Sequence, residues 1–215
     1  FVKSDWLVIN KKVTSANTFG ESADFTPEEI ADLERQPWVR SVGRFTTADF
    51  RIFARMSAGN GTGRSMSTSL FFESIPDEYV DVDKSLWRWK KGSNEVPVII
   101  SRDYLTLYNF GFASSAGLPQ MSEGLMSGIP LELTLTSEDG TRMKRFKGHV
   151  AGYSNRLNTI LVPDEFMRIE NAELGSGATR NPSRLVVDVN SPGDVAISEY
   201  LEARDLEVAG DKSGA

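Results

Sequence analysis

Few residues of this 215-residue chain have the types and spacing that catalysis would need. His149 is the only histidine, so a Ser-His-Asp hydrolase would have to use it as its base. It stands in a predicted strand, Phe146–Gly152, and no G-x-S-x-G motif that would present a serine nucleophile accompanies it. A lone histidine in a strand is more often a packed or surface residue than a base. The sequence therefore predicts no catalytic residue.

Carboxylates gather at Asp77, Glu78, Asp81 and Asp83. A calcium loop needs D-x-[DN]-x-[DN]-G spacing and a distal glutamate, and this cluster does not meet that pattern. Zinc would need several carboxylates beside the single histidine, because the chain has no cysteine. Paired carboxylates for glycoside hydrolysis stay open as an alternative to a solvated turn. We expect no metal site and no cofactor.

Glycines recur at Gly59, Gly61 and Gly63, where a phosphate-binding loop could be imagined. A dinucleotide fingerprint needs G-x-G-x-x-G opening a helix directly after a strand. Here the third glycine comes one residue early, and a Ser/Thr-rich segment follows. The segment is more typical of a flexible crossing. No GxxxxGK[ST] motif occurs, so we expect no ATP site in this chain.

Two groups of apolar side chains could instead contact a partner. Trp87 and Trp89 flank Arg88, and on a strand both indoles would face the same side, either as an exposed platform or as a cap on the core. An apolar loop interrupted by glycine and serine residues follows, and it is either an exposed contact surface or a lid packed on the core. Both alternatives stay open for its candidate contact residues, which are Phe110, Phe112, Leu118, Met121 and Met126.

Composition excludes several classes of protein. The formal net charge is −6 and the isoelectric point about 5.0, which argues against nucleic-acid binding because such proteins usually carry a basic face. No apolar run approaches the 18 residues or more that a membrane span needs. The chain is long enough to bury its own core. These features predict a soluble globular piece.

The elements near the amino-terminal end predict a strand, a helix and further strands. Trp6–Val13 is rich in strand-forming residues. Thr26 can cap a helix with Pro27 at its first position and Glu29 closing a capping box. We expect that helix to end at Gln36, before a proline. Strands are predicted next at Val39–Thr46 and Phe50–Met56.

The carboxy-terminal end repeats this order. Leu185–Val189 is a β-branched run, Ser191-Pro192-Gly193-Asp194 precedes a predicted helix, and Leu206–Val208 is a short closing strand. Two βαβ-like halves at opposite ends of the chain predict a split, ferredoxin-like α+β unit.

The middle of the chain is richer in strand candidates. Glu138-Asp139-Gly140 is a hairpin turn signal, and short helices are predicted at Ser101–Asn109 and Asp164–Ile169. The predicted strands are Ser67–Phe72, Val96–Ile100, Leu131–Leu135, Met143–Tyr153 and Asn158–Val162. We therefore expect a β-rich insertion within the split unit.

This organisation predicts two subdomains. The first is discontinuous, residues 1–60 with 178–209, and the second is the insertion, residues 64–174. Ala58–Gly63 and Gly175–Gly177 are the predicted flexible crossings. Residues 210–215 form a polar tail that we expect to be disordered.

The central segment resembles a known family. Its motifs are PVIISRDYLTLYN at Pro97–Asn109, GLP at Gly117–Pro119, and GHVAGYSNRLNTILVP at Gly148–Pro163 followed by Phe166-Met167. They are similar to the extracytoplasmic, periplasmic core domain of MacB/FtsX-like ABC transporter permeases. In that family a split porter-type unit holds an inserted subdomain.

The resemblance implies a role and partners. It implies a non-catalytic domain at the cell inner membrane, facing the periplasm or extracytoplasmic space and lying between two transmembrane helices of its own protein. A separate ATPase domain or subunit would drive it. It would relay that motion to substrate, to an adaptor protein or to a lipoprotein. It implies no nucleic-acid partner, and the isolated domain would be monomeric.

This interpretation predicts that the two chain ends lie within about 20 Å of each other, a few strand spacings. Two alternatives from other classes remain. One is a free-standing extracellular peptide- or glycan-binding module, which exposed, coplanar Trp87 and Trp89 would favour. The other is a carboxylate-based hydrolase, which a cleft joining His149 to acidic residues would favour.

Overall fold

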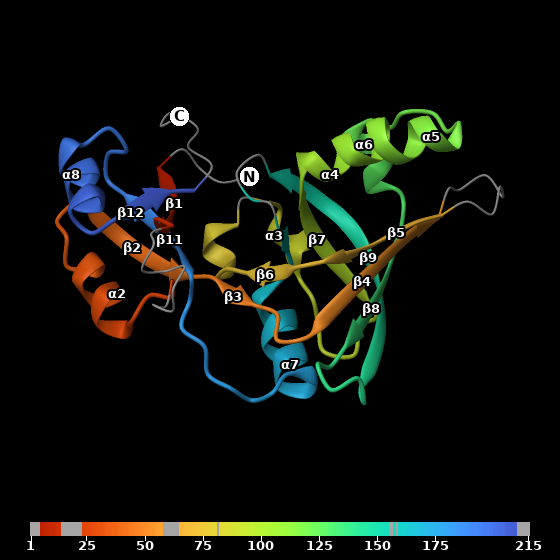
Figure 1. Cartoon of the computed structure of the whole chain (residues 1–215), viewed down its shortest axis with the longest axis horizontal. Coiled ribbons are helices and arrows are strands. Elements are labelled where there is room, and N and C mark those ends of the chain that lie inside the picture. Colours follow the sequence, from red (N-terminus) through yellow and green to blue (C-terminus); the bar gives the residue numbers. More distant parts are fainter. Residues whose placement is uncertain are drawn as a thin grey trace.

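The computed structural model describes residues 5–13, 23–57, 65–80, 82–154, 157 and 159–209. Its strands form two sheets, one of four strands and one of eight. Figure 1 shows the smaller sheet with two helices on the left and the larger sheet with the remaining helices on the right. The fold is therefore mixed α and β, as predicted.

The smaller sheet joins both ends of the chain. Its strands are β1 (Trp6–Lys11), β2 (Val39–Arg44), β11 (Arg184–Val189) and β12 (Leu206–Val208). Their order is β12-β1-β11-β2, and each neighbouring pair is antiparallel. Helices α2 (Pro27–Glu34) and α8 (Val195–Ala203) connect β1 to β2 and β11 to β12. This is the strand order of a split βαβ unit, with everything between β2 and β11 inserted.

The capping residues explain where the two helices begin. The Thr26 side chain accepts a hydrogen bond from the Glu29 amide at 3.1 Å, and the Glu29 carboxylate accepts one from the Thr26 amide at 3.1 Å. The predicted capping box is thus present, although the helix ends two residues before Gln36. Asp194 caps α8 by accepting from Ala196 at 2.9 Å, so Pro192 precedes the cap instead of opening the helix.

Both faces of the smaller sheet are covered, which accounts for the continuous apolar run of β11. Leu185 and Val187 pack in a cluster with residues of α2 and α8. Val186 points to the other face and packs in a second cluster with Trp6 and Val8 of β1. Because successive side chains of a strand point to opposite faces, a run without polar residues indicates burial on both sides.

The larger sheet has the order β3-β6-β10-β7-β9-β8-β4-β5. Its strands are β3 (Thr46–Thr47), β4 (Arg51–Ser57), β5 (Ser65–Leu70), β6 (Phe72–Ser74), β7 (Glu95–Ser101), β8 (Leu131–Thr136), β9 (Met143–Ser154) and β10 (Ile160–Leu161). The predicted turn at Glu138-Asp139-Gly140 joins β8 to β9, which pair as a hairpin with Thr136 opposite Met143.

This sheet curls back on itself. Only Phe71 separates β5 from β6, yet β5 pairs with β4 and β6 pairs with β10 at the other side of the sheet. The segment that runs from β5 through β6 thus pairs with strands at both sides of the larger sheet. The curled sheet encloses the main hydrophobic core, which includes Leu70, Val98 and Leu133.

Helices close the two ends of this core. At one end lie α4 (Arg102–Thr106), the π-helix η2 (Leu107–Ala113), α5 (Ser114–Ala116) and α6 (Glu123–Ser127). At the other end lies α7 (Asp164–Leu174), and Figure 1 shows it below the sheet while α4, α5 and α6 lie above. The short elements η1 (Asp77–Tyr79) and α3 (Lys84–Trp87) follow β6.

The predicted division of the chain at residue 60 differs from sheet membership. The smaller sheet ends at Arg44, whereas β4, which the prediction assigned to the first subdomain, pairs with β5 and β8 of the larger sheet. Residues 58–63 connect two paired strands of one sheet. Those residues, Asp81 and the tail 210–215 lie outside the described residues. The chain actually changes sheet at Phe45, where nothing in the local sequence signals a break.

Candidate functional site

The candidate contact surface is the helical cap, residues 102–127, over one end of the larger sheet (Figure 1). Ser101 caps α4 by accepting from the Asp103 amide, and Ser122 caps α6 by accepting from the Leu125 amide. Gly117 ends α5 with a φ of 67°, a left-handed conformation that glycine adopts without steric cost. The motif around Gly117–Pro119 therefore marks the reversal of the chain within the cap.

The side chain of Asn109 links two segments of the cap. The Asn109 side chain donates to the Met121 carbonyl at 3.0 Å and accepts from the Met121 amide at 2.7 Å. The Tyr153 hydroxyl on β9 donates to the Glu123 carbonyl at 3.0 Å, and Arg102 pairs with Glu123. Burial raises the pKa of Tyr153 above its usual value. These bonds tie the cap to itself and to the sheet, a role for Asn109 that the sequence did not indicate.

The cap presents some apolar side chains and buries others. Phe110 is 69% exposed, and Leu107 and Leu125 are also exposed. Phe112, Leu118 and Met121 are half-buried against the core, and Met126 is buried in it. The segment is thus exposed at some residues and packed on the core at others, and its contact with a partner stays a prediction. The exposed group lies on and beside a π-helix, a rare conformation that often marks functional sites.

A small apolar cavity lies beneath the cap. It has a volume of about 50 Å³ and is lined by Tyr104 and Met126 of the cap and by strand residues that include Met56 and Met66. Burial raises the pKa of Tyr104. Methionine side chains are flexible and polarisable, so they adapt to changes in packing. The cap thus rests on a surface that can adapt to small movements.

Trp87 and Trp89 do not form an exposed platform. Trp87 is 2% and Trp89 8% exposed, and they belong to different hydrophobic clusters. Trp87 ends the short helix α3, Arg88 is extended, and Trp89 lies outside any helix or strand, so the assumption of one continuous strand was wrong. Trp89 packs edge-on against Phe166 at 5.1 Å and donates to the Ser93 carbonyl at 3.1 Å. Both side chains therefore pack in the hydrophobic interior.

The residues with catalytic or metal-binding potential are dispersed. His149 is half-buried on β9 opposite Pro97 of β7. Asp83 caps α3 by accepting from the Ser85 amide at 2.9 Å, and this contact with Ser85 lowers the pKa of Asp83. Asp77 and Glu78 lie in η1. Across the ranges that the structure describes, no three of these residue types gather to hold a metal ion.

A junction of polar contacts joins the larger sheet to the segment through which the chain returns to the smaller sheet. Asp49, in the loop between β3 and β4, accepts from the Ser176 amide at 2.6 Å, from its hydroxyl at 2.7 Å and from Arg180 at 2.8 Å. The bonds from Ser176 lower the pKa of Asp49. Asn171 accepts from the Asp49 amide at 2.7 Å. The crossing at Gly175–Gly177, predicted to be flexible, is therefore bonded through Ser176 to the β3–β4 loop of the larger sheet.

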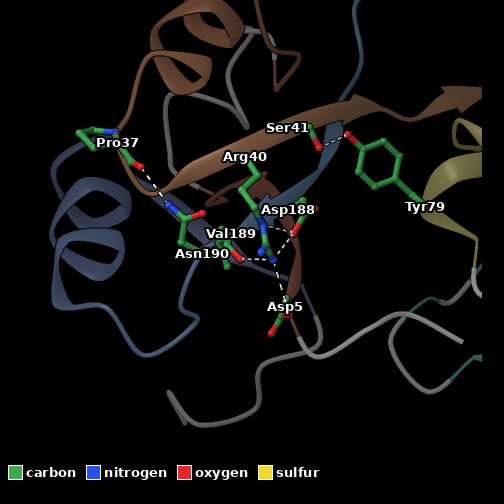
Figure 2. A network of polar contacts seen from close by, with 8 residues as sticks. All are labelled: Asp5, Pro37, Arg40, Ser41, Tyr79, Asp188, Val189 and Asn190. Carbon is green, nitrogen blue, oxygen red and sulfur yellow. Dashed lines mark hydrogen bonds and ion pairs between the residues drawn. The ribbon is translucent and has the colours of Figure 1, made fainter.

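An apolar cluster fills the space between the sheets. Trp6, Val8 and Val186 of the smaller sheet meet Tyr79 and other residues of the insertion; we call this the inter-sheet cluster, and its remaining buried members are Phe45, Ile75, Val80, Trp87, Ile99, Leu157 and Leu161. Figure 2 shows the Tyr79 hydroxyl reaching the Ser41 hydroxyl of β2, at 2.7 Å.

Charged side chains reinforce the same junction. Arg184 of β11 pairs with Glu73 of β6, across the two sheets, and lies over the Phe45 ring at 4.9 Å. Burial lowers the pKa of Arg184. Within the smaller sheet, Arg40 of β2 bonds Asp188 of β11 at 2.8 Å (Figure 2). Removing one partner alone from the more buried Arg184–Glu73 pair would strongly destabilise the fold, because the other charge would be left without its partner.

Among the helices of the described residues, none has the length and apolar character to cross a membrane. No curated protein matches the chain significantly. Among solved structures, the periplasmic region of MacB from Actinobacillus actinomycetemcomitans is similar at 14% identity and a TM-score of 0.45, over 98% of this chain and 91% of that chain. The extracellular domain of the noncanonic ABC-type transporter YknZ from Gram-positive bacteria is similar at 15% identity and a TM-score of 0.38, over 94% and 98%.

A domain of a putative permease from Porphyromonas gingivalis is similar at 13% identity and a TM-score of 0.36, over 95% of this chain and 88% of that chain. Residues 7–211 match the family described as "PCD-like: Probable transporter periplasmic core domain". This match confirms the extracytoplasmic transporter domain that the resemblance implied. The chain belongs to this family of transporter periplasmic core domains.

Proposed function

We propose that this domain belongs to an ABC transporter permease of the inner membrane and relays ATP-driven movement of the transmembrane helices to substrate or partner proteins outside the membrane. The cytoplasmic ATPase, as a separate domain or subunit, supplies the energy. The domain performs no catalysis in this scheme. Its task is to move as one body and to present a contact surface.

The observation that carries the proposal is the pairing of β1 with β12. Ile9 stands opposite Val208 and Lys11 opposite Leu206, in an antiparallel pair. The Ala209 amide also donates to the Val8 carbonyl at 2.7 Å. The start of β1 and the end of β12 therefore lie at the same end of one sheet. Transmembrane helices attached there would move two adjacent strands together, as a relay requires.

The junction supports transmission through the rest of the domain. A force that displaces β1 would act directly on the inter-sheet cluster, since Trp6 and Val8 are buried in that cluster. Close-packed interiors transmit strain because they have low compressibility. The contacts of Asp49 and the Arg184–Glu73 pair resist separation of the sheets at the crossings. We therefore assign the two sheets to a porter-type subdomain and an inserted subdomain that move together.

The cap is the surface that we assign to a partner, such as an adaptor protein or a lipoprotein. Phe110, Leu107 and Leu125 are exposed there, and aromatic side chains are enriched at protein interfaces. Met126 of α6 is buried and supports this surface from within the fold. Trp87 and Trp89 are also buried, in the inter-sheet cluster and against Phe166 of α7, so they lie outside this surface.

The relay is tested in the full-length transporter with its ATPase, in nanodiscs. Spin labels are placed at Val195→Cys on α8 and Glu138→Cys in the β8–β9 turn, both exposed and in a chain without cysteine. The distance between these two labels should stay the same with and without ATP. The distance between Glu138→Cys labels on two paired copies should change. A change within one domain, or no change between copies, refutes the relay.

A further inference from the structure

A basic surface covers the outer face of β4, β8 and β9. On β4, exposed Arg51, Phe53 and Arg55 alternate with buried residues. In register across the sheet, Phe53 stands opposite Thr134, which stands opposite Arg145 of β9. The next row places Arg55 opposite Glu132, which stands opposite Lys147. The strand alternation therefore gathers these side chains on one face.

The charge of this surface is opposite to that of the whole chain, whose formal net charge is −6. Four cations, Arg51, Arg55, Arg145 and Lys147, share this face with Glu132, and Glu95 stands at its border next to Lys147 in register. Arg51 donates to the Ser137 carbonyl at 3.4 Å, beside the turn that holds Glu138 and Asp139. The Arg55–Glu132 pair is long, at 3.9 Å, and exposed. In the described ranges of the chain, no ion pair involves Arg145 or Lys147.

The surface is hollowed on both sides of Phe53. A hollow of about 630 Å³ is lined by Phe53, Arg145 and Lys147, and a second of about 230 Å³ by Phe53, Arg51 and Thr136. Phe53 is 49% exposed between them. Two hollows that flank one exposed side chain can receive successive side chains of an extended polypeptide, whereas a broad bilayer surface would not fill them. The shape therefore fits a polypeptide segment better than a membrane.

We propose that this face binds an acidic polypeptide segment that places an apolar side chain against Phe53. Cations around an exposed aromatic residue are the combination found at protein interfaces, with the aromatic as anchor and the charges steering association. This surface lies on strands, apart from the helical cap, and the inference does not depend on the relay.

The probe is a fluorescein-labelled peptide of alternating glutamate and leucine, followed by fluorescence anisotropy with the 215-residue chain. We expect binding that weakens as salt is added. The Arg145→Glu, Lys147→Glu double variant should bind at least tenfold more weakly, because the surface changes sign. Phe53→Ala should also weaken binding, by about fivefold.

The controls make the same changes elsewhere. Arg35→Glu with Arg44→Glu alters the net charge equally, at the C-cap of α2 and on β2, and Phe71→Ala removes an exposed phenylalanine between β5 and β6. These variants should bind as the parent does. Equal loss in the controls, equal affinity for a lysine–leucine peptide, or no binding overturns the proposal. Preferential binding to phosphatidylglycerol vesicles through the same residues also overturns it, in favour of a lipid surface.

Discussion

Asp49 offers a direct test of how the segment between α7 and β11 is held against the larger sheet. The side chain is 9% exposed, and one of its oxygens accepts both the amide and the hydroxyl of Ser176. Hydrogen bonds to a charged acceptor contribute about 1.5 kcal/mol each or more, so Asp49→Ala should lower the free energy of unfolding by about 3 kcal/mol. Asp49→Asn retains an acceptor for Ser176 and should cost about 1 kcal/mol.

The assay is urea denaturation of the 215-residue chain, followed by tryptophan fluorescence. With a slope of about 2 kcal/mol per M, the alanine variant should shift the midpoint by about 1.5 M. Glu138→Ala, in the exposed β8–β9 turn, is the control and should change the free energy of unfolding by less than about 0.5 kcal/mol. A shift as small as this control, or equal shifts for the alanine and asparagine variants, would refute the role assigned to Ser176.

The same site predicts a pH dependence. Bonds from Ser176 lower the pKa of Asp49 in the folded state, so the folded state favours the ionised form. That contribution is fully present above the ordinary pKa of the unfolded chain, 3.8, and is lost as pH falls through the lower folded value. The difference between the parent and Asp49→Asn should therefore shrink in acid.

Three further predictions concern other contacts. Gly43→Ala should lower the free energy of unfolding by about 1–3 kcal/mol, since its Cβ would lie 2.5 Å from the Tyr79 ring. Gly193→Ala is the control, because its Cβ would meet nothing within 4 Å. Equal urea midpoints for the two variants would contradict this prediction. Leu133→Ala, in the core, should cost about 2–5 kcal/mol in urea denaturation. Burial raises the pKa of Glu170 although Lys144 lies 3.0 Å from its carboxylate, and Lys144 keeps Glu173 as a second partner. Glu170→Gln should therefore stabilise at pH 7, with a gain that fades as pH falls below that raised pKa; a loss at pH 7 would disprove it.

Local chemistry was enough to predict most elements. The capping box of α2 depends on residues three apart, and β11 and β12 lie within about a residue of their predicted bounds. The split βαβ unit followed from the order of these elements and is confirmed by the strand order of the smaller sheet. The assignment of the chain to a family of extracytoplasmic transporter domains followed from motifs in the central segment and is confirmed by the family match.

The contact residues were harder to predict, because exposure depends on neighbours distant in sequence. Trp87 and Trp89 have the same type and spacing as an exposed strand pair, yet the end of α3 between them sends them into different clusters. Leu107 was assigned only to a helix, and nothing local showed that a π-helix would expose it beside Phe110. The basic face had no sequence signal, since its cations come from two strands far apart in the chain.

By itself, the sequence determined the elements, the split architecture and the family, because capping, strand propensity and motif spacing act within a few residues. Only the tertiary structure decided that β4 joins the larger sheet, that β1 lies beside β12, and that Asp49 bonds Ser176. The β4–β8 pairing joins residues about 80 positions apart, and the other two contacts join residues more than a hundred positions apart. Their geometry comes from how the two sheets pack, and no local pattern records it.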